Sequence, residues 1–158
     1  MLSQSQIKQL KSLHQKKFRE QEKKIILEGY RLILQALIAD ADIIMVCMTL
    51  GYADSILGKD LKQMLEDKDI LIETVSEKEI EKICDSQNNQ GIVAVMHFPE
   101  YKPLKDLPIY SLYLDDISDP GNMGTLLRTS VWFGINSVFL SPGCVDPLNS
   151  KVLRSAMG

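Results

Sequence analysis

The feature that most constrains the fold is a series of short apolar runs that alternate with segments of helical periodicity. The run 43–48 is apolar at every position, which is typical of a strand buried on both faces. Segments between the runs place apolar residues at helical spacing. The alternation predicts a compact α/β sandwich. We expect strands at 25–27, 43–48, 70–75 and 91–97, and helices at 4–20, 30–39, 56–66 and after Ser76, which begins a capping box with Glu79.

A second unit follows a segment that is rich in proline. Residues 98–108 contain three prolines and no periodicity, which is typical of a linker between domains. Beyond it we expect strands at 109–114 and 137–140, a loop at 115–124 and a helix at 125–133 that stops at Gly134. Asn149 or Ser150 would cap a last helix.

Composition places the chain among ordinary globular proteins. Of 158 residues, 45% are hydrophobic and 25% charged, which excludes collagen and a wholly disordered chain. No apolar run reaches the ~18 residues that a membrane span needs. The cysteines, at positions 47, 84 and 144, are widely spaced and odd in number. They predict a reduced, cytoplasmic protein without a bound metal.

Charge is unevenly distributed along the chain. The net charge is −3, but residues 1–24 carry +5 and the remainder carries −8. A basic arm on an acidic body is a common way to contact a polyanion. A solvated lysine-rich helix would show the same pattern, so charge alone leaves both interpretations open.

The loop that is richest in turn-forming residues lies between an expected strand and an expected helix. It reads D-P-G-N-M-G at 119–124, where Gly121 and Gly124 would give the loop its geometry. Arg128 follows on the first turn of the expected helix, and its planar guanidinium suits a phosphate or a carboxylate. The spacing fits neither a dinucleotide fingerprint nor a P-loop, so an ordinary turn beside an exposed arginine remains an alternative.

Residues 114–158 closely resemble the SpoU (TrmH-like) family of RNA ribose methyltransferases. The first family signature is D-P-x-N-x-G-x-x-x-R-T-A, and the second is P-x-x-x-K-x-x-R-x-S. Their positions here are Asn122, Gly124, Arg128 and Thr129, with Ser130 where alanine is usual, and then Pro147, Lys151 and Arg154. Ser155 directly follows Arg154, one position earlier than the serine of the signature.

The first part of the chain also matches this family, through L-E-G-Y-R-L at 27–32 and N-Q-G-I-V-A at 89–94. The resemblance implies an α/β fold of two domains. A basic helical arm at 1–20 precedes an RNA substrate-binding domain at 21–97, similar to ribosomal proteins that bind kink-turns. After a linker at 98–108, residues 109–158 begin a SPOUT-type, knotted methyltransferase domain.

Family members transfer a methyl group from S-adenosylmethionine to a ribose 2′-hydroxyl in RNA. The additional domain favours ribosomal RNA over transfer RNA as the substrate. By resemblance, Arg128 is the catalytic arginine and Asn122 orders the loop and the ribose. An arginine pKa above ~12 leaves almost no neutral form at pH 7. We therefore expect Arg128 to orient the substrate and stabilise charge rather than to act as the general base.

The same resemblance assigns RNA contacts to basic side chains in both parts of the chain. Lys16, Lys17 and Arg19 belong to the basic arm. Lys151 and Arg154 lie on the last helix, where Arg154 could equally cap the helix end.

Other conspicuous side chains have simpler interpretations. Trp132 sits at helical spacing with Leu and Val, which favours a place in the helix core or in a subunit interface. Glu28, at the end of a strand, is more often structural than functional. His14 and His97 have no companions and are expected to be incidental.

In this family the cofactor is bound by loops of a C-terminal knot, which also forms a homodimer. The resemblance therefore predicts cofactor-binding residues beyond Gly158 and a chain that is truncated. It predicts that residues 1–158 alone do not bind S-adenosylmethionine. A non-catalytic RNA-binding module is the main alternative function, and a generic nucleotide-binding α/β protein is a weaker one.

Overall fold

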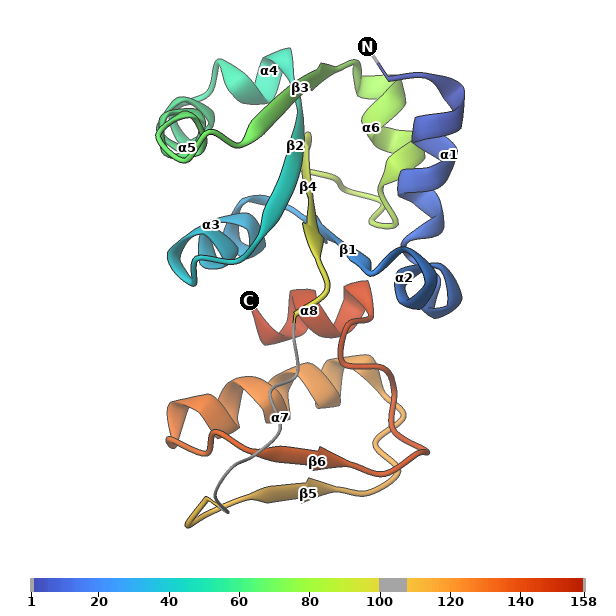
Figure 1. Cartoon of the computed structure of the whole chain (residues 1–158), viewed down its shortest axis with the longest axis vertical. Coiled ribbons are helices and arrows are strands. Elements are labelled where there is room, and N and C mark those ends of the chain that lie inside the picture. Colours follow the sequence, from blue (N-terminus) through green and yellow to red (C-terminus); the bar gives the residue numbers. More distant parts are fainter. Residues whose placement is uncertain (1, 100–107, 158) are drawn as a thin grey trace. The chain divides into compact units, whose positions relative to one another are not determined.

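The computed structural model describes residues 2–99 and 108–157. These residues form two compact units that divide between Phe98 and Pro99 (Figure 1). Most of the predicted linker, residues 100–107, lies outside the described residues.

The first unit contains a sheet of four strands with helices on both faces. Its elements are α1 (Gln4–Ser12), α2 (Lys16–Glu22), β1 (Lys24–Glu28), α3 (Tyr30–Ile38), β2 (Ile43–Thr49), α4 (Leu50–Ala53), α5 (Ile56–Glu66), β3 (Leu71–Val75), α6 (Glu77–Ile83) and β4 (Ile92–His97). The predicted α/β class is confirmed, and the short helix α4 was not predicted. In α6, the capping box of Ser76 and Glu79 is present as expected.

The strands are arranged in the order β1-β4-β2-β3. β2 and β3 pair in parallel, whereas β4 is antiparallel to both β1 and β2. The last strand thus lies in the centre, and β1, β2 and β3 all run in one direction. Their carboxyl ends meet at one edge of the sheet.

The core of this unit lies on both faces of the sheet. Figure 1 shows α3 and α5 on one face and α1 and α6 on the other. On the side of α1 and α6, the buried side chains of Ile7, Leu10 and Ile80 pack with Cys47 and Val93 of the central strands. Continuous apolar runs in β2 and β4 are explained by this burial on two faces.

The expected helix at 4–20 is in fact two helices, α1 and α2, with a break at 13–15. The guanidinium group of Arg19 donates hydrogen bonds to the carbonyl oxygens of Leu13 at 3.1 Å and His14 at 2.7 Å. Carbonyl groups at a helix end lack partners within the helix. A buried side chain from the second helix therefore stabilises the break, which sequence periodicity alone could not reveal.

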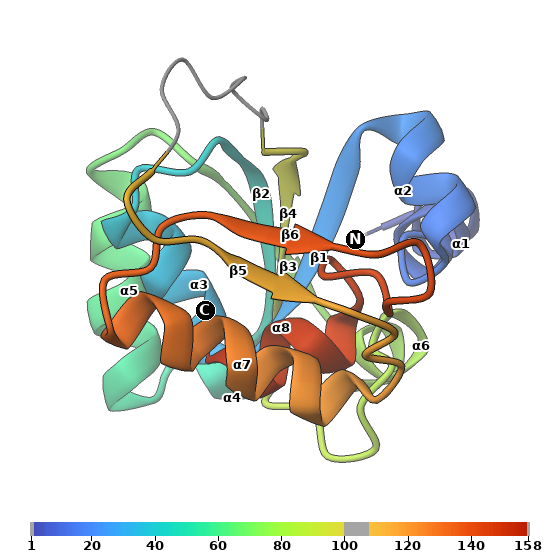
Figure 2. The same ribbon diagram turned by 90° about the horizontal axis from the view of Figure 1, so that it is seen from below.

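The second unit contains β5 (Leu112–Leu114), α7 (Pro120–Trp132), β6 (Val138–Leu140) and α8 (Ser150–Ala156). β5 and β6 lie side by side as a parallel pair (Figure 2). α7 lies between this pair and α8 (Figure 1). Leu114, Met123 and Val152 form the buried centre of the unit.

Helix α7 begins at Pro120, five residues before the predicted start at 125. The Asp119 carboxylate caps it by accepting a hydrogen bond of 2.7 Å from the backbone N–H of Asn122, and Pro120 occupies the first helical position. Both features favour helix initiation. At the other end, Gly134 has a φ of +73° and the helix stops, as predicted.

Candidate active site

The glycines of the D-P-G-N-M-G segment lie in a helix and not in a loop. Gly121 and Gly124 belong to the first turns of α7, and neither has a positive φ. Their predicted role in loop geometry is therefore wrong. The glycine at 124 instead permits a close contact between helices, because a Cβ atom there would lie 2.6 Å from the carbonyl oxygen of Val152.

Asn122 and Arg128 are both exposed on α7. Six residues of helix separate them by about 9 Å along the axis and by about 240° around it. They therefore point in different directions. A single bound group could contact both side chains only if it extended around the helix. Arg128 also lies on the third turn of the helix rather than the first, since α7 begins early.

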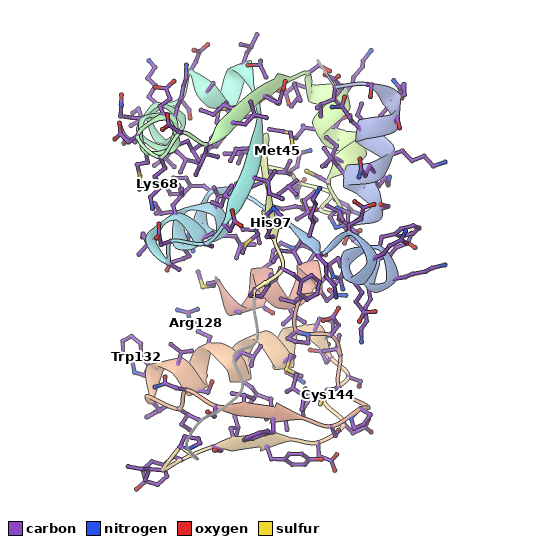
Figure 3. The ribbon with its side chains drawn as sticks, in the orientation of Figure 1. Met45, Lys68, His97, Arg128, Trp132 and Cys144 are labelled. Atoms are coloured by element: carbon purple, nitrogen blue, oxygen red, sulfur yellow. The ribbon has the colours of Figure 1, made fainter. Side chains whose placement is uncertain are left out.

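Arg128 lies on the side of α7 that faces α8 (Figure 3). Its guanidinium Nη1 donates a hydrogen bond to the sulfur of Met157, the residue that ends α8. Guanidinium carries five N–H donors, so a single contact of this kind leaves the group able to bind an anion.

Helix α8 carries the two other basic residues of the signature. Asn149 caps it by accepting a hydrogen bond of 2.9 Å from the N–H of Lys151, as one of the two predicted caps. Lys151 is exposed and Arg154 is half-buried in the last turn. Their contact with RNA stays a prediction.

The loops that follow β5 and β6 are bound to each other. The Ser141 hydroxyl accepts a hydrogen bond of 2.9 Å from the N–H of Asp116. The thiol of Cys144 accepts from the N–H of Ile117 at 3.4 Å and donates to the carbonyl oxygen of Leu114 at 3.3 Å. Sequence analysis did not assign this role to Cys144, because no motif marks a thiol that joins two loops.

In the first unit, the basic residues of the arm have different environments. Lys16 and Lys17 are exposed at the start of α2. Arg19 is only 3% exposed and binds backbone carbonyl groups. The predicted RNA contact of Arg19 is corrected by this burial, which gives the side chain a structural role.

Glu28 and His14 together join three segments of the first unit. The buried Glu28 carboxylate accepts hydrogen bonds from the hydroxyl of Ser86 at 2.6 Å and from its N–H at 3.2 Å. The His14 Nε2 lies 3.4 Å from the same carboxylate and donates to the carbonyl oxygen of Ile83 at 2.8 Å. These contacts favour the structural interpretation of Glu28, and His14 is not incidental.

The two family motifs of this unit meet at the carboxyl end of β1. The Gln90 side-chain oxygen accepts a hydrogen bond of 2.9 Å from the N–H of Tyr30. Gly29 and Gly91 have φ values of +92° and +75°, which only glycine adopts readily. Nearby, burial raises the pKa of Tyr52 to about 12, and the neighbouring Tyr30 contributes.

Trp132 is 86% exposed and ends α7, where Figure 3 labels it. Its neighbours Val131 and Phe133 are 71% and 75% exposed. The expectation that Trp132 belongs to the helix core is wrong, because α7 turns this face away from its own strands. Its place in a subunit interface stays a prediction.

The described residues show neither a metal site nor a membrane-spanning helix. Within 2–99 and 108–157, no group of three His, Cys, Asp or Glu side chains is arranged to hold a metal ion. No helix in the same ranges is long and apolar enough to cross a membrane.

Comparison with known proteins decides the family. Residues 4–94 match the MRM3-like substrate binding domain, and residues 110–158 match the SpoU rRNA Methylase family. The chain belongs to the SpoU methylase family. The signature helices α7 and α8 fall within the second match, and the sheet of the first unit falls within the first, apart from the end of β4.

Relatives of this SpoU methylase chain include two bacterial proteins. It is 33% identical over 154 residues to the 23S rRNA (guanosine(2553)-2'-O)-methyltransferase of Bacillus subtilis, and covers 57% of that protein. It is 32% identical over 155 residues to an uncharacterized tRNA/rRNA methyltransferase of Synechocystis, and covers 55% of it. Each match spans 96% of this chain.

A solved structure of similar fold is the AdoMet-bound rRNA methyltransferase of Sinorhizobium meliloti. The TM-score is 0.80 at 26% identity, over all of this chain and 59% of that one. The chain thus spans a little over half the length of these three proteins.

Proposed function

We propose that this chain contains the substrate-binding domain and the first part of the catalytic domain of an enzyme that methylates ribose 2′-hydroxyl groups in ribosomal RNA. The observation that carries the proposal is the signature pair on α7 and α8, preceded by a domain of the substrate-binding type. Arg128 and Asn122 would be its catalytic residues.

A ribose 2′-hydroxyl is a weak nucleophile, so the reaction depends on positioning and on stabilisation of the charge that develops. The exposed guanidinium of Arg128 is held at the α8 side of α7 and carries a permanent charge. It would bind an RNA phosphate or the developing alkoxide in two-point fashion. Asn122, in the capped first turn, would hold the ribose from another side of the helix.

S-adenosylmethionine, when bound, would supply the methyl group. We assign none of the described residues to the cofactor, because polar groups at the carboxyl ends of β5 and β6 are paired with each other. The support for this methyl donor is the AdoMet-bound relative of similar fold.

RNA would be bound by basic residues in both units. The candidates are the exposed Lys16, Lys17 and Lys151 and the half-buried Arg154, and Arg19 is excluded by its burial. The domain boundaries, the cytoplasmic location and a homodimer of the whole enzyme are further proposals from the family resemblance.

The test is methyl transfer by the whole protein that the gene encodes. Ribosomal RNA from a strain that lacks the gene would be incubated with the enzyme and labelled S-adenosylmethionine, and ribose methylation would be mapped. We expect methylation at a discrete site and a loss of at least about a hundredfold in kcat in Arg128→Lys, since lysine cannot bind in two-point fashion.

The matched control is Lys59→Arg on α5, an exposed position outside both signatures. It should leave kcat unchanged. Near-normal turnover in Arg128→Lys would contradict the role of the guanidinium, and the absence of any methylation would contradict the proposed function.

A further inference from the structure

Three residues of α7 follow one another at intervals of four, namely Pro120, Gly124 and Arg128. Residues spaced in this way lie on one face of a helix. The end of α8 contacts all three. α8 therefore runs along the face of α7 that carries the candidate catalytic arginine.

The middle contact is made by the backbones of the two helices. A Cβ atom on Gly124 would lie 2.6 Å from the carbonyl oxygen of Val152, 2.7 Å from the N–H nitrogen of Ala156 and too close to the Ser155 hydroxyl. No side chain other than hydrogen fits at this position. The backbones of α7 and α8 are therefore in direct contact at this position.

At one end of the stripe, the Ser155 hydroxyl lies against the first turn of α7. Its oxygen lies 3.0 Å from the carbonyl oxygen of Pro120, and 2.9 Å from those of Lys151 and Val152 in its own helix. The hydroxyl has one proton for these three acceptors, and only the Pro120 carbonyl belongs to α7. That carbonyl is in the first turn, which also holds Asn122.

At the other end, Met157 contacts Arg128. Met157 ends α8 in the left-handed conformation with a φ of +63°, and its sulfur is in direct contact with the guanidinium Nη1 of Arg128. A thioether is a weak acceptor, so it can hold the side chain in place without neutralising its charge.

We infer that the last turn of α8 positions the candidate catalytic residues, with Ser155 acting on the first turn of α7 and Met157 acting on Arg128. Both would be positioning residues, since they act through α7 and the Arg128 side chain. The effect on catalysis rests on the proposed function, whereas the effect on the mobility of Arg128 does not. Misplacement of a catalytic group by about 1 Å can cost a hundredfold in rate, so weak contacts of this kind can matter.

The first measurement is made on residues 1–158. NMR relaxation of the Arg128 side-chain Nε–Hε group reports how rigidly the guanidinium is held. We expect its order parameter to fall in Met157→Leu, which nearly preserves volume but removes the sulfur. It should also fall in Ser155→Ala, because the turn of α8 that carries Met157 is then held less firmly against α7. The matched control is Ser130→Ala on α7, because the buried Ser130 hydroxyl donates within its own helix, to Leu127.

The second measurement is steady-state methyl transfer by the whole protein. Ser155→Ala and Met157→Leu should each lower kcat about tenfold, while KM for RNA and for S-adenosylmethionine changes less than about twofold. A residue that only stabilised the fold would lower the melting temperature and leave kcat at low temperature unchanged.

Each outcome decides one part of the inference. If Arg128 is as rigid in both variants as in Ser130→Ala, the positioning role is wrong, whatever the activity. If Arg128 loosens but kcat does not change, its position does not limit catalysis and the inference fails at that step. If the wild-type protein methylates no RNA, the proposed function fails, and the NMR result still decides whether α8 orders Arg128.

Discussion

Two basic side chains in α2, Lys17 and Arg19, show how different the roles of neighbouring cations can be. Lys17 is exposed, whereas Arg19 is 3% exposed and binds the carbonyl oxygens at the end of α1. Arginine suits this position because a single guanidinium nitrogen, Nη1, carries two N–H groups and donates to both carbonyl oxygens. Residues 1–24 do carry the excess of basic side chains that predicts an arm. One of these side chains, Arg19, stabilises the arm instead of contacting RNA.

Replacement of Arg19 by glutamine should lower the free energy of unfolding by about 2–3 kcal/mol, because hydrogen bonds from a charged donor are lost inside the protein. Urea denaturation of residues 1–158 measures this. The control, Lys17→Gln, should change stability by less than about 0.5 kcal/mol. Equal destabilisation by the two variants would show that Arg19 is not the structural side chain of the pair.

Glu79 provides a pH-dependent contact at the start of α6. The N–H and the hydroxyl of Ser76 donate to its carboxylate and hold its pKa below the ordinary value of 4.5. Because the folded pKa is depressed, this contribution is present above pH 4.5 and is lost as pH falls through the folded pKa. Titration by carbon NMR should show the Glu79 pKa rising in Ser76→Ala, and unchanged in Ser55→Ala, which removes the cap of α5 instead.

Among the elements, α7 and α8 pair through a glycine, and the two glycines of α7 test this contact. The Gly124 position has no room for a methyl group, whereas a Cβ atom on Gly121 would approach only one side chain, the capping carboxylate of Asp119, at 3.0 Å, and would require a small shift of it. Both residues are helical, so their intrinsic preferences are the same.

Gly124→Ala should therefore destabilise the second unit by about 1–3 kcal/mol, as expected for overpacking against backbone atoms. Gly121→Ala should be neutral or stabilise it by up to about 1 kcal/mol, because alanine favours a helix over glycine. Thermal unfolding followed through the single Trp132 measures both. A neutral Gly124→Ala would mean that α8 can move away from α7 at little cost.

For the whole molecule, the division into two units predicts that the first one folds alone. Its sheet has a helix layer on each face and a core that is made by its own residues. The amide NMR spectrum of residues 1–98 should superimpose on the corresponding signals of residues 1–158. A collapsed, poorly dispersed spectrum would contradict this.

The same fragment should bind RNA with an affinity that falls steeply with salt, because its basic residues displace counterions. Lys16→Gln and Lys17→Gln should each reduce the slope of log affinity against log salt by about 1. Lys59→Gln and Lys62→Gln, on the exposed face of α5, should change it less. Equal effects of both pairs would place the RNA contact outside the arm.

Sequence alone determined the family, the order of most elements and the residues of both signatures, because these depend on local periodicity and on the spacing of a few side chains. It located the capping box at Ser76 and the helix stop at Gly134 for the same reason: each is decided by contacts within four residues. The start of α7 at Pro120 was missed, although Asp119 and Pro120 carry the signal, because the glycines were assigned to a loop.

Only the tertiary structure decided which of these residues are exposed and can contact a substrate. Three features depend on segments that are distant in the sequence. They are the burial of Arg19, the position of β4 between β1 and β2, and the packing of Ser155 against Gly124. Periodicity reports which face of an element is apolar, but not what that face packs against. The positioning of Arg128 by α8 is therefore a property of the fold, although every residue that takes part is visible in the sequence.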